Sequence, residues 1–131
     1  MLLKDLTGEL RKDLSHETMR GAYLTGADLT GADLTASDLE SARMSGADLT
    51  GAWLRYTRLY QADLTGANLT GADLTGANLT HANLTHAYLT HANLTHANLT
   101  GANLTGANMF MAIGTKAKLS GATMPDGTIH D

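Results

Sequence analysis

Apolar residues recur along this chain with a period of five. From Leu24 to Met124, every fifth position is Leu or Met in 20 of 21 cases, and Gly114 is the exception. The position two residues before each of these is Ala, except at Ser37 and Thr57. The pattern marks two apolar and three polar positions in each unit and holds without insertion over roughly 105 residues, which indicates a repeat architecture.

A period of five excludes an α-helix and favours short extended segments. Five residues advance a helix by about 500°, so the leucines would spread over every helical face. In an extended Ala-x-Leu segment, Ala and Leu share one face and the residue between them points outward. An odd period breaks this alternation, so the chain is expected to turn once in every unit, and Gly at the last position permits the turn.

Units such as "ADLTG" and "ANLTG" resemble the pentapeptide-repeat family, whose motif is A(D/N)LXX. The resemblance covers residues 22–126, and the final "MPDGTIHD" is similar to the endings of cyanobacterial members. It implies an all-β fold, a right-handed quadrilateral parallel β-helix with four units per coil and about five coils. Leu and Ala would point inward, and residues one coil apart would stack in columns.

The ends of such a coil need cover, because they expose apolar core and unpaired backbone. Residues 1–21 are expected to form a partly helical N-terminal cap, with leucines at helical spacing. Residues 22–126 would form the β-helix and residues 127–131 a C-terminal tail. Four apolar residues near the C-terminal end interrupt the repeat, and they are interpreted either as a cap or as a dimer contact: Met109, Phe110, Met111 and Ile113.

Composition excludes several classes of function. A net charge of −4 argues against a nucleic-acid-binding protein, and the absence of cysteine excludes disulfides and thiolate metal sites. Apolar runs are too short to span a membrane, and the charged N-terminus is unlike a signal peptide. We therefore expect a cytoplasmic protein without a cofactor and without a membrane or nucleic-acid partner.

Four histidines spaced by five residues suggest a metal site at first reading: His81, His86, His91 and His96. Each of them occupies the last position of its unit, so each would lie at a different corner of one coil. Zinc requires ligands that converge on one ion at about 2.0–2.1 Å from each nitrogen. The histidines would diverge, so no metal site is expected, and tolerated surface variation or a weak pH response are the remaining interpretations.

The segment "AWLRYTRLYQ" keeps its inward leucines and replaces the usual outward residues. Trp, Tyr and Arg are enriched in binding hot spots, so this segment is a candidate surface for a protein partner. The alternative is a decorated surface whose side chains interact only with neighbouring coils. We name these outward residues the aromatic–arginine patch: Trp53, Arg55, Tyr56, Arg58 and Tyr60.

The sequence thus favours a non-catalytic interaction or scaffold module, either a monomer or an end-to-end homodimer. It contains no nucleophile–base constellation and no phosphate-binding loop, so an enzyme is not expected. Family resemblance implies one alternative, a DNA mimic that binds a type II topoisomerase, although the acidic residues concentrate in the N-terminal half. Flat ranks of Thr and Asn suggest a second alternative, an ice-binding solenoid.

Overall fold

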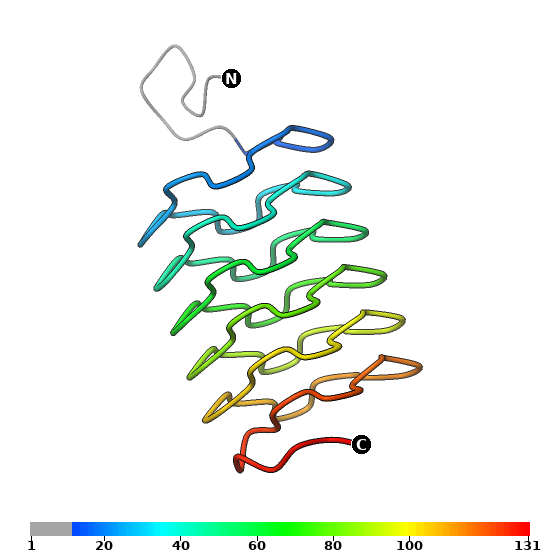
Figure 1. Cartoon of the computed structure of the whole chain (residues 1–131). Helices are drawn as coiled ribbons and strands as arrows, with labels where there is room; N and C mark the ends of the chain where they lie inside the picture. Colours follow the sequence, from blue (N-terminus) through cyan, green and yellow to red (C-terminus); the bar gives the residue numbers. More distant parts are fainter. Residues whose placement is uncertain (1–11) are drawn as a thin grey trace.

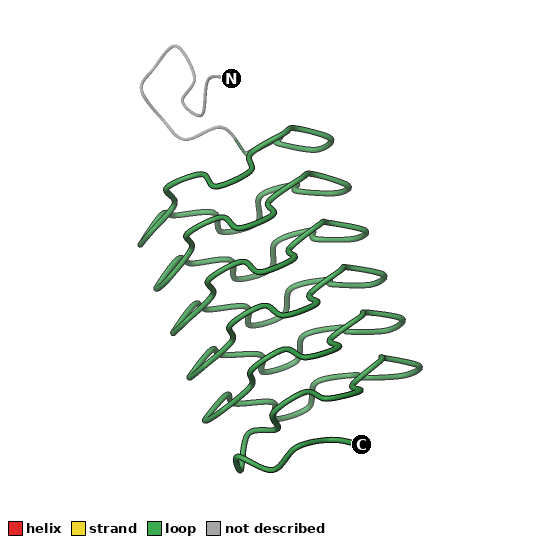
Figure 2. Ribbon diagram, in the orientation of Figure 1, coloured by secondary structure: helices red, strands yellow, loops and turns green. Residues whose placement is uncertain are grey.

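The computed structural model describes residues 12–131, which form a stack of coils running from the N-terminal to the C-terminal end (Figure 1). The outward residue before each central Leu or Met forms a parallel bridge with the residue 20 positions later, from Asp13 with Asp33 to Asn103 with Thr123. Each coil therefore contains 20 residues, as the family resemblance implied. Within residues 12–131 these bridges stay isolated, with no helix and no extended strand, so Figure 2 draws this part entirely as loop.

Backbone hydrogen bonds join each coil to the coils before and after it. In the unit around Leu49, the Leu49 and Gly51 amides donate to carbonyls of the following coil at 2.7 and 2.9 Å. The Asp48 amide donates to a carbonyl of the preceding coil at 2.9 Å. Three of the five amides in the unit thus hold adjacent coils together, which satisfies the backbone without extended strands.

The other two amides of the unit are satisfied at its turns. The amide of Ala47 donates to the carbonyl three residues earlier at 3.1 Å, which closes a β-turn. The amide of Thr50 donates at 3.0 Å to the side chain of Asp48, and the Thr50 hydroxyl donates to the same oxygen at 2.6 Å. The Asp and Thr of this unit therefore satisfy a backbone amide through their side chains. The Asp acts within its own unit rather than in a ladder between coils.

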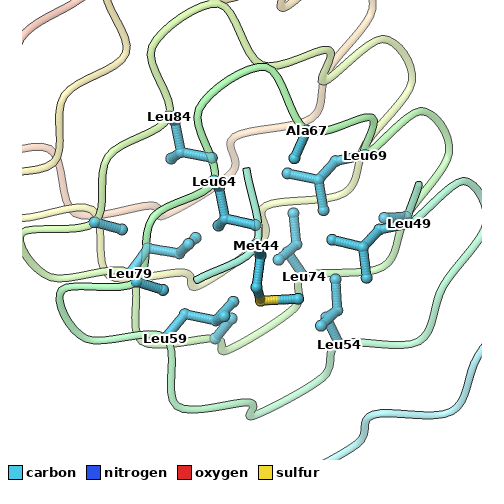
Figure 3. Packing of buried hydrophobic residues seen from close by; sticks show 14 of the residues in the cluster. Met44, Leu49, Leu54, Leu59, Leu64, Ala67, Leu69, Leu74, Leu79 and Leu84 are labelled. Carbon is cyan, nitrogen blue, oxygen red and sulfur yellow. The ribbon is translucent and has the colours of Figure 1, made fainter. Parts of the chain in front are cut away.

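The central leucines and the alanines fill the interior, as expected (Figure 3). Leu49, Leu54 and Leu64 are fully buried, and so are most of the alanines that lie beside them. Ser37 and Thr57 occupy two of the alanine positions, and both hydroxyls donate to the carbonyl of Leu34 at 2.7 Å. Buried hydroxyls are tolerated there because each one finds an acceptor.

Four sides run along the stack, and each is named here after one of its central leucines. The Leu24, Leu29, Leu34 and Leu39 faces follow one another around each coil, and every later unit falls on the face of the unit 20 residues before it. The Leu34 face carries Trp53 and the Leu24 face lies opposite to it. Since the outward columns stack one coil apart, each outward side chain has neighbours about 4.8 Å above and below it.

The regular coil begins earlier than residue 22, where the sequence placed its start. Asp13 and Thr18 already form parallel bridges to the next coil, so residues 13–21 belong to the stack. Glu17 is only half-buried in its alanine position, because the first coil lies at the end of the core. The helix expected from the spacing of leucines in residues 1–10 lies outside the described residues.

At the C-terminal end the chain folds back against the last coil, where the red segment closes the stack in Figure 1. Ile129 forms an antiparallel bridge with Thr123, and the His130 amide donates to the carbonyl of Ala122 at 2.8 Å. The expected tail therefore extends the hydrogen bonding of one face. Among residues 12–131, no helix has the length and apolar character needed to cross a membrane.

Candidate functional site

All five side chains of the aromatic–arginine patch point away from the core. Trp53, Arg55, Tyr56 and Arg58 are exposed and Tyr60 is half-buried, whereas Leu54 between them is fully buried. The structure thus places the five residues on two adjacent faces and the corner between them. This arrangement follows directly from the repeat, because each of them occupies one of its three outward positions.

Part of the patch is engaged with neighbouring coils. Arg55 donates to the Asp73 carboxylate at 2.7 Å, and Arg58 lies 3.8 Å from the Glu40 carboxylate. The ring of Tyr60 meets the imidazole of His81 edge-on, with 6.1 Å between the ring centroids. The two arginines and Tyr60 therefore have partners within the chain, which leaves Trp53 and Tyr56 as the freest aromatic surface.

Tyr56 stands at a corner where the backbone has a positive φ of 58°. Its ring lies over Gly76 in the next coil, since a Cβ added to that glycine would approach the ring to 2.6 Å. Tyr56 is nevertheless 63% exposed, so it presents a flat surface to solvent. Glycine at position 76 makes room for the ring, and this pairing was not apparent from the sequence.

A shallow depression lies beside Trp53 at the corner between the Leu29 and Leu34 faces. It has a volume of about 270 Å³ and is lined by Gly51, Ala52, Trp53, Gly71 and Asp73. Trp53 is 54% exposed and forms its wall. This depression therefore adjoins the aromatic–arginine patch through Trp53.

Carboxylates near the depression have pKa values below their ordinary range. Burial raises the pKa of Asp73, but hydrogen bonds from Thr75 and Arg55 lower it by more. The hydroxyl and then the amide of Thr50 lower the pKa of Asp48. Both groups are ionised at neutral pH, and Asp48 leaves negative charge beside this corner, whereas Arg55 pairs with Asp73.

The four histidines point outward from four successive corners of the coil. All are exposed, with φ between 58° and 61°. The rings of His81 and His86 lie over glycines of the next coil, and the ring of His91 meets Phe110 edge-on at 6.2 Å. The side chains therefore diverge, and residues 12–131 contain no cluster of metal-binding side chains.

Backbone conformation supplies a reason for the histidines that sequence reasoning missed. The last position of each unit adopts a left-handed conformation, which Gly accepts freely. His, Asn and Asp are enriched among non-glycine residues with positive φ. His16 occupies the same position with a φ of 59°. The sequence signal for this conformation is that His stands at the position where most other units have Gly.

The four apolar residues near the C-terminal end separate into two groups. Met109 is half-buried against the core, whereas Phe110, Met111 and Ile113 are at least 50% exposed. Leu119, in the same coil, is also only partly buried, in contrast to the fully buried leucines of inner coils. The last coil therefore presents more apolar surface than the coils before it.

Comparisons with known proteins agree with this architecture. The family described as pentapeptide repeats matches residues 13–40, 42–80 and 72–109, with 8 copies of the repeat. Comparison with curated proteins finds no match.

Two solved structures illustrate the similarity. Rfr23, a pentapeptide repeat protein from the cyanobacterium Cyanothece 51142, is 36% identical over 76% of this chain, with a TM-score of 0.67. This chain spans 65% of the length of Rfr23. HetL, a pentapeptide repeat protein of Nostoc involved in regulating heterocyst differentiation, is 32% identical over 92% of this chain and 82% of its own, with a TM-score of 0.47.

Proteins of this kind form right-handed quadrilateral β-helices and are generally structural or interaction modules rather than enzymes. The family match extends from residue 13 to residue 109, over the same units that build the stacked coils. The chain therefore belongs to the pentapeptide-repeat proteins.

Proposed function

We propose that this protein is a non-catalytic interaction module that binds a partner protein through the aromatic–arginine patch. The observation that carries the proposal is the exposure of Trp53 and Tyr56 on coils whose outward positions otherwise hold mainly Asp, Asn, Thr and Gly. Exposed Trp and Tyr supply large contact areas and are enriched among the residues that dominate binding energy. The fully buried leucines on either side hold the patch on a fixed frame.

The test separates binding from folding. Trp53→Asn, Tyr56→Gly and Tyr60→Thr together restore residues that the repeat uses at these positions. Surface changes of this kind usually alter stability by about 0.5 kcal/mol or less, whereas loss of one hot-spot anchor weakens binding by about 2 kcal/mol or more. We expect the triple variant to melt like the parent and to lose partners that the parent captures from extract of the source organism.

Tyr88→Asn is the matched control. Tyr88 is 52% exposed and occupies the same position of the repeat as Trp53, but it lies outside the patch. This control variant should capture the same proteins as the parent. Equal capture by the parent and the triple variant would contradict the proposal.

Charge along the stack does not favour the topoisomerase alternative. No Asp or Glu occurs between Asp73 and Asp126, so the acidic surface ends near the middle of the chain, and Lys116 and Lys118 lie on the last coil. Mimicry of DNA requires regular negative charge along a rod, because the phosphates of DNA are evenly spaced. The acidic half of this molecule would supply only a short stretch of it.

The ice-binding alternative meets a different difficulty. Arg55, Tyr60 and Phe110 interrupt three of the four Thr columns. Hydroxyls such as those of Thr85 and Thr105 also donate to Asn side chains of their own units at 2.6 Å. Freezing-point hysteresis of the purified protein tests this alternative directly, and we expect none.

The apolar C-terminal coil leads to a second part of the proposal, which is that the protein is a monomer or an end-to-end homodimer in the cytoplasm. Phe110, Met111 and Ile113 would cover the end of the core or contact a second copy. Sedimentation equilibrium distinguishes the two states. If a dimer forms, Phe110→Thr with Ile113→Asn should dissociate it without lowering the melting temperature of the inner coils.

A further inference from the structure

Trp53 lies between two aspartates in its outward column. It bridges to Asp33 in the preceding coil and to Asp73 in the following coil, each about 4.8 Å away along the stack. All three residues belong to one outward column of the Leu34 face. The exposed indole therefore has a negative charge on each side of it along the stack.

Three consecutive coils have glycine at the corner beside Trp53. Gly51 and Gly71 line the depression, and a Cβ added to either glycine would meet no atom within 4 Å. Gly31 continues the same corner in the preceding coil and is equally open. Another chain can therefore approach the backbone closely along three coils.

Negative charge extends across the corner onto the Leu29 face. Asp28 and Asp48 lie in its outward column, and the Asp28 side chain is 77% exposed. Lys12 lies 3.4 Å from Asp28, and Arg55 pairs with Asp73. Among the described residues these two cations pair with Asp28 and Asp73, whereas Asp33 and Asp48 have no ion pair, so the corner remains negative.

The same chain already places a cation over an exposed aromatic ring in this position of the repeat. The guanidinium of Arg43 lies 5.0 Å from the centroid of the Tyr23 ring, one coil earlier in its column. In the Trp53 column the equivalent neighbours are Asp33 and Asp73 instead of arginine. Among the described residues no cation lies over the Trp53 ring, so a cation stacked there would come from another molecule. Asp33 would attract it, because Arg55 already pairs with Asp73.

We propose that the depression beside Trp53 binds an arginine side chain within a basic segment of the partner protein. This inference rests on the proposed function and specifies the chemistry of its partner. Trp is the aromatic side chain that binds cations best, within about 6 Å of the ring centroid. A guanidinium stacks flat on the indole and donates paired hydrogen bonds to a carboxylate, whereas an ammonium group does neither as well.

Intrinsic fluorescence tests the proposal directly, because Trp53 is the sole tryptophan of the chain. The probes are short synthetic peptides in which glycine alternates with arginine, with lysine or with glutamate. We expect the arginine peptide to change the Trp53 emission saturably and to bind at least about threefold more tightly than the lysine peptide. The glutamate peptide should leave the emission unchanged.

Asp33→Asn is the informative variant and Asp63→Asn its matched control. Asparagine keeps the acceptor oxygen that holds the Thr35 amide at 3.0 Å and the Thr65 amide at 3.0 Å, so both variants should fold. Both remove one negative charge, but Asp63 lies on the Leu24 face opposite Trp53. Asp33→Asn should weaken the arginine peptide about threefold to fivefold, and Asp63→Asn by much less.

Equal weakening by the two variants would overturn the proposal, because it would indicate attraction to net charge rather than binding beside Trp53. Equal binding of arginine and lysine peptides would also contradict the choice of arginine. If these results appear while the triple patch variant still loses captured partners, the interaction function stands and the assigned occupant is wrong. If peptides bind as expected but capture is unchanged in the triple variant, the proposed function is wrong.

Discussion

At the scale of single residues, the residues of the repeat satisfy backbone hydrogen bonds as well as filling the core. The amide of the fourth residue in a unit does not reach a neighbouring coil, and where the second residue is Asp or Asn, its side-chain oxygen accepts that amide. Thr at the fourth position donates its hydroxyl to the same oxygen. Pro125 occupies that fourth position in the last unit, where Thr123 replaces the usual Asp or Asn, and proline has no amide to satisfy.

Removing one of these acceptors should therefore be costly. Asn93→Ala leaves the Thr95 amide, now bonded to Asn93 at 3.0 Å, without its acceptor. The expected loss is about 1 kcal/mol of unfolding free energy, measured by chemical denaturation. Asn93→Asp is the control, since a carboxylate accepts the same bond, and it should stay within about 0.5 kcal/mol of the parent. Equal losses for both variants would contradict the role of the acceptor.

The histidine positions carry a second prediction, which follows from their positive φ. Replacing His81, His86, His91 and His96 with Gly relieves the left-handed conformation and loses the ring contacts, so the quadruple variant should melt close to the parent near pH 8. His86→Val should instead destabilise by about 1–2 kcal/mol, because a β-branched residue is strained there. Thermal unfolding of both variants provides the measurement. If the valine variant were as stable as the glycine variant, the positive φ at this position would not disfavour a β-branched side chain, and the prediction would be wrong.

At the scale of the unit and the coil, each unit consists of an inward Ala and Leu followed by a turn. Neighbouring coils accept and donate one another's backbone hydrogen bonds. The amide of Ala77 closes the turn before it at 3.0 Å, and the Asn78 amide donates to the preceding coil at 2.9 Å. Isolated bridges replace extended strands because the chain turns before a second residue can join the ladder. The coil, rather than the strand, is therefore the smallest unit that buries a core.

Core burial varies along the stack, and this variation predicts a graded response to charge. Leu74 is fully buried in the middle of the stack, whereas Leu119 in the last coil is partly exposed. Leu74→Lys forces an ammonium group into the interior and should abolish cooperative unfolding. In Leu119→Lys the ammonium group can reach solvent, so the melting temperature of this variant should fall less than that of Leu74→Lys. Wild-type stability of Leu74→Lys in a thermal scan would refute the inward assignment of the central position.

At the scale of the whole molecule, charge is distributed unevenly along the axis. Acidic residues occupy the coils up to Asp73, the histidine-bearing coil that follows has no Asp, Glu, Lys or Arg, and Lys116 and Lys118 lie in the last coil. Hydrogen bonds lower the pKa values of Asp48 and Asp73 below the ordinary value of 3.8. Stability of the acidic half is consequently linked to pH.

The sign of this linkage follows from the lowered pKa values. Below about pH 4 the unfolded chain binds more protons than the folded one, so the unfolding free energy should decrease as the pH falls through the folded-state values. Asp48→Asn with Asp73→Asn removes both titrating groups and keeps both acceptors, which should flatten the decrease. Denaturation curves recorded between about pH 5 and pH 2.5 compare the two proteins. Parallel decreases would show that these carboxylates do not contribute.

The sequence by itself determined the period, the inward positions and the outward position of the patch. These features follow from an uninterrupted register, because a spacing of five residues leaves a chain few ways to bury both Ala and Leu. The repeat alone puts Trp53 and Arg58 outside the core, since Leu54 and Leu59 keep their inward positions. The family is recognisable from the sequence for the same reason.

Only the tertiary structure decided how outward residues meet across coils and where the regular stack begins. The four-unit coil that the family resemblance implied already made Asp33 and Asp73 the neighbours of Trp53, whereas the position of the Tyr56 ring over Gly76 came only from the structure. Rotamers and backbone φ, which set these contacts, are not encoded in the hydrophobic pattern. Thr18 joined the first coil despite the break in its unit, because backbone pairing at the end of the stack depends on amides and carbonyls more than on side chains.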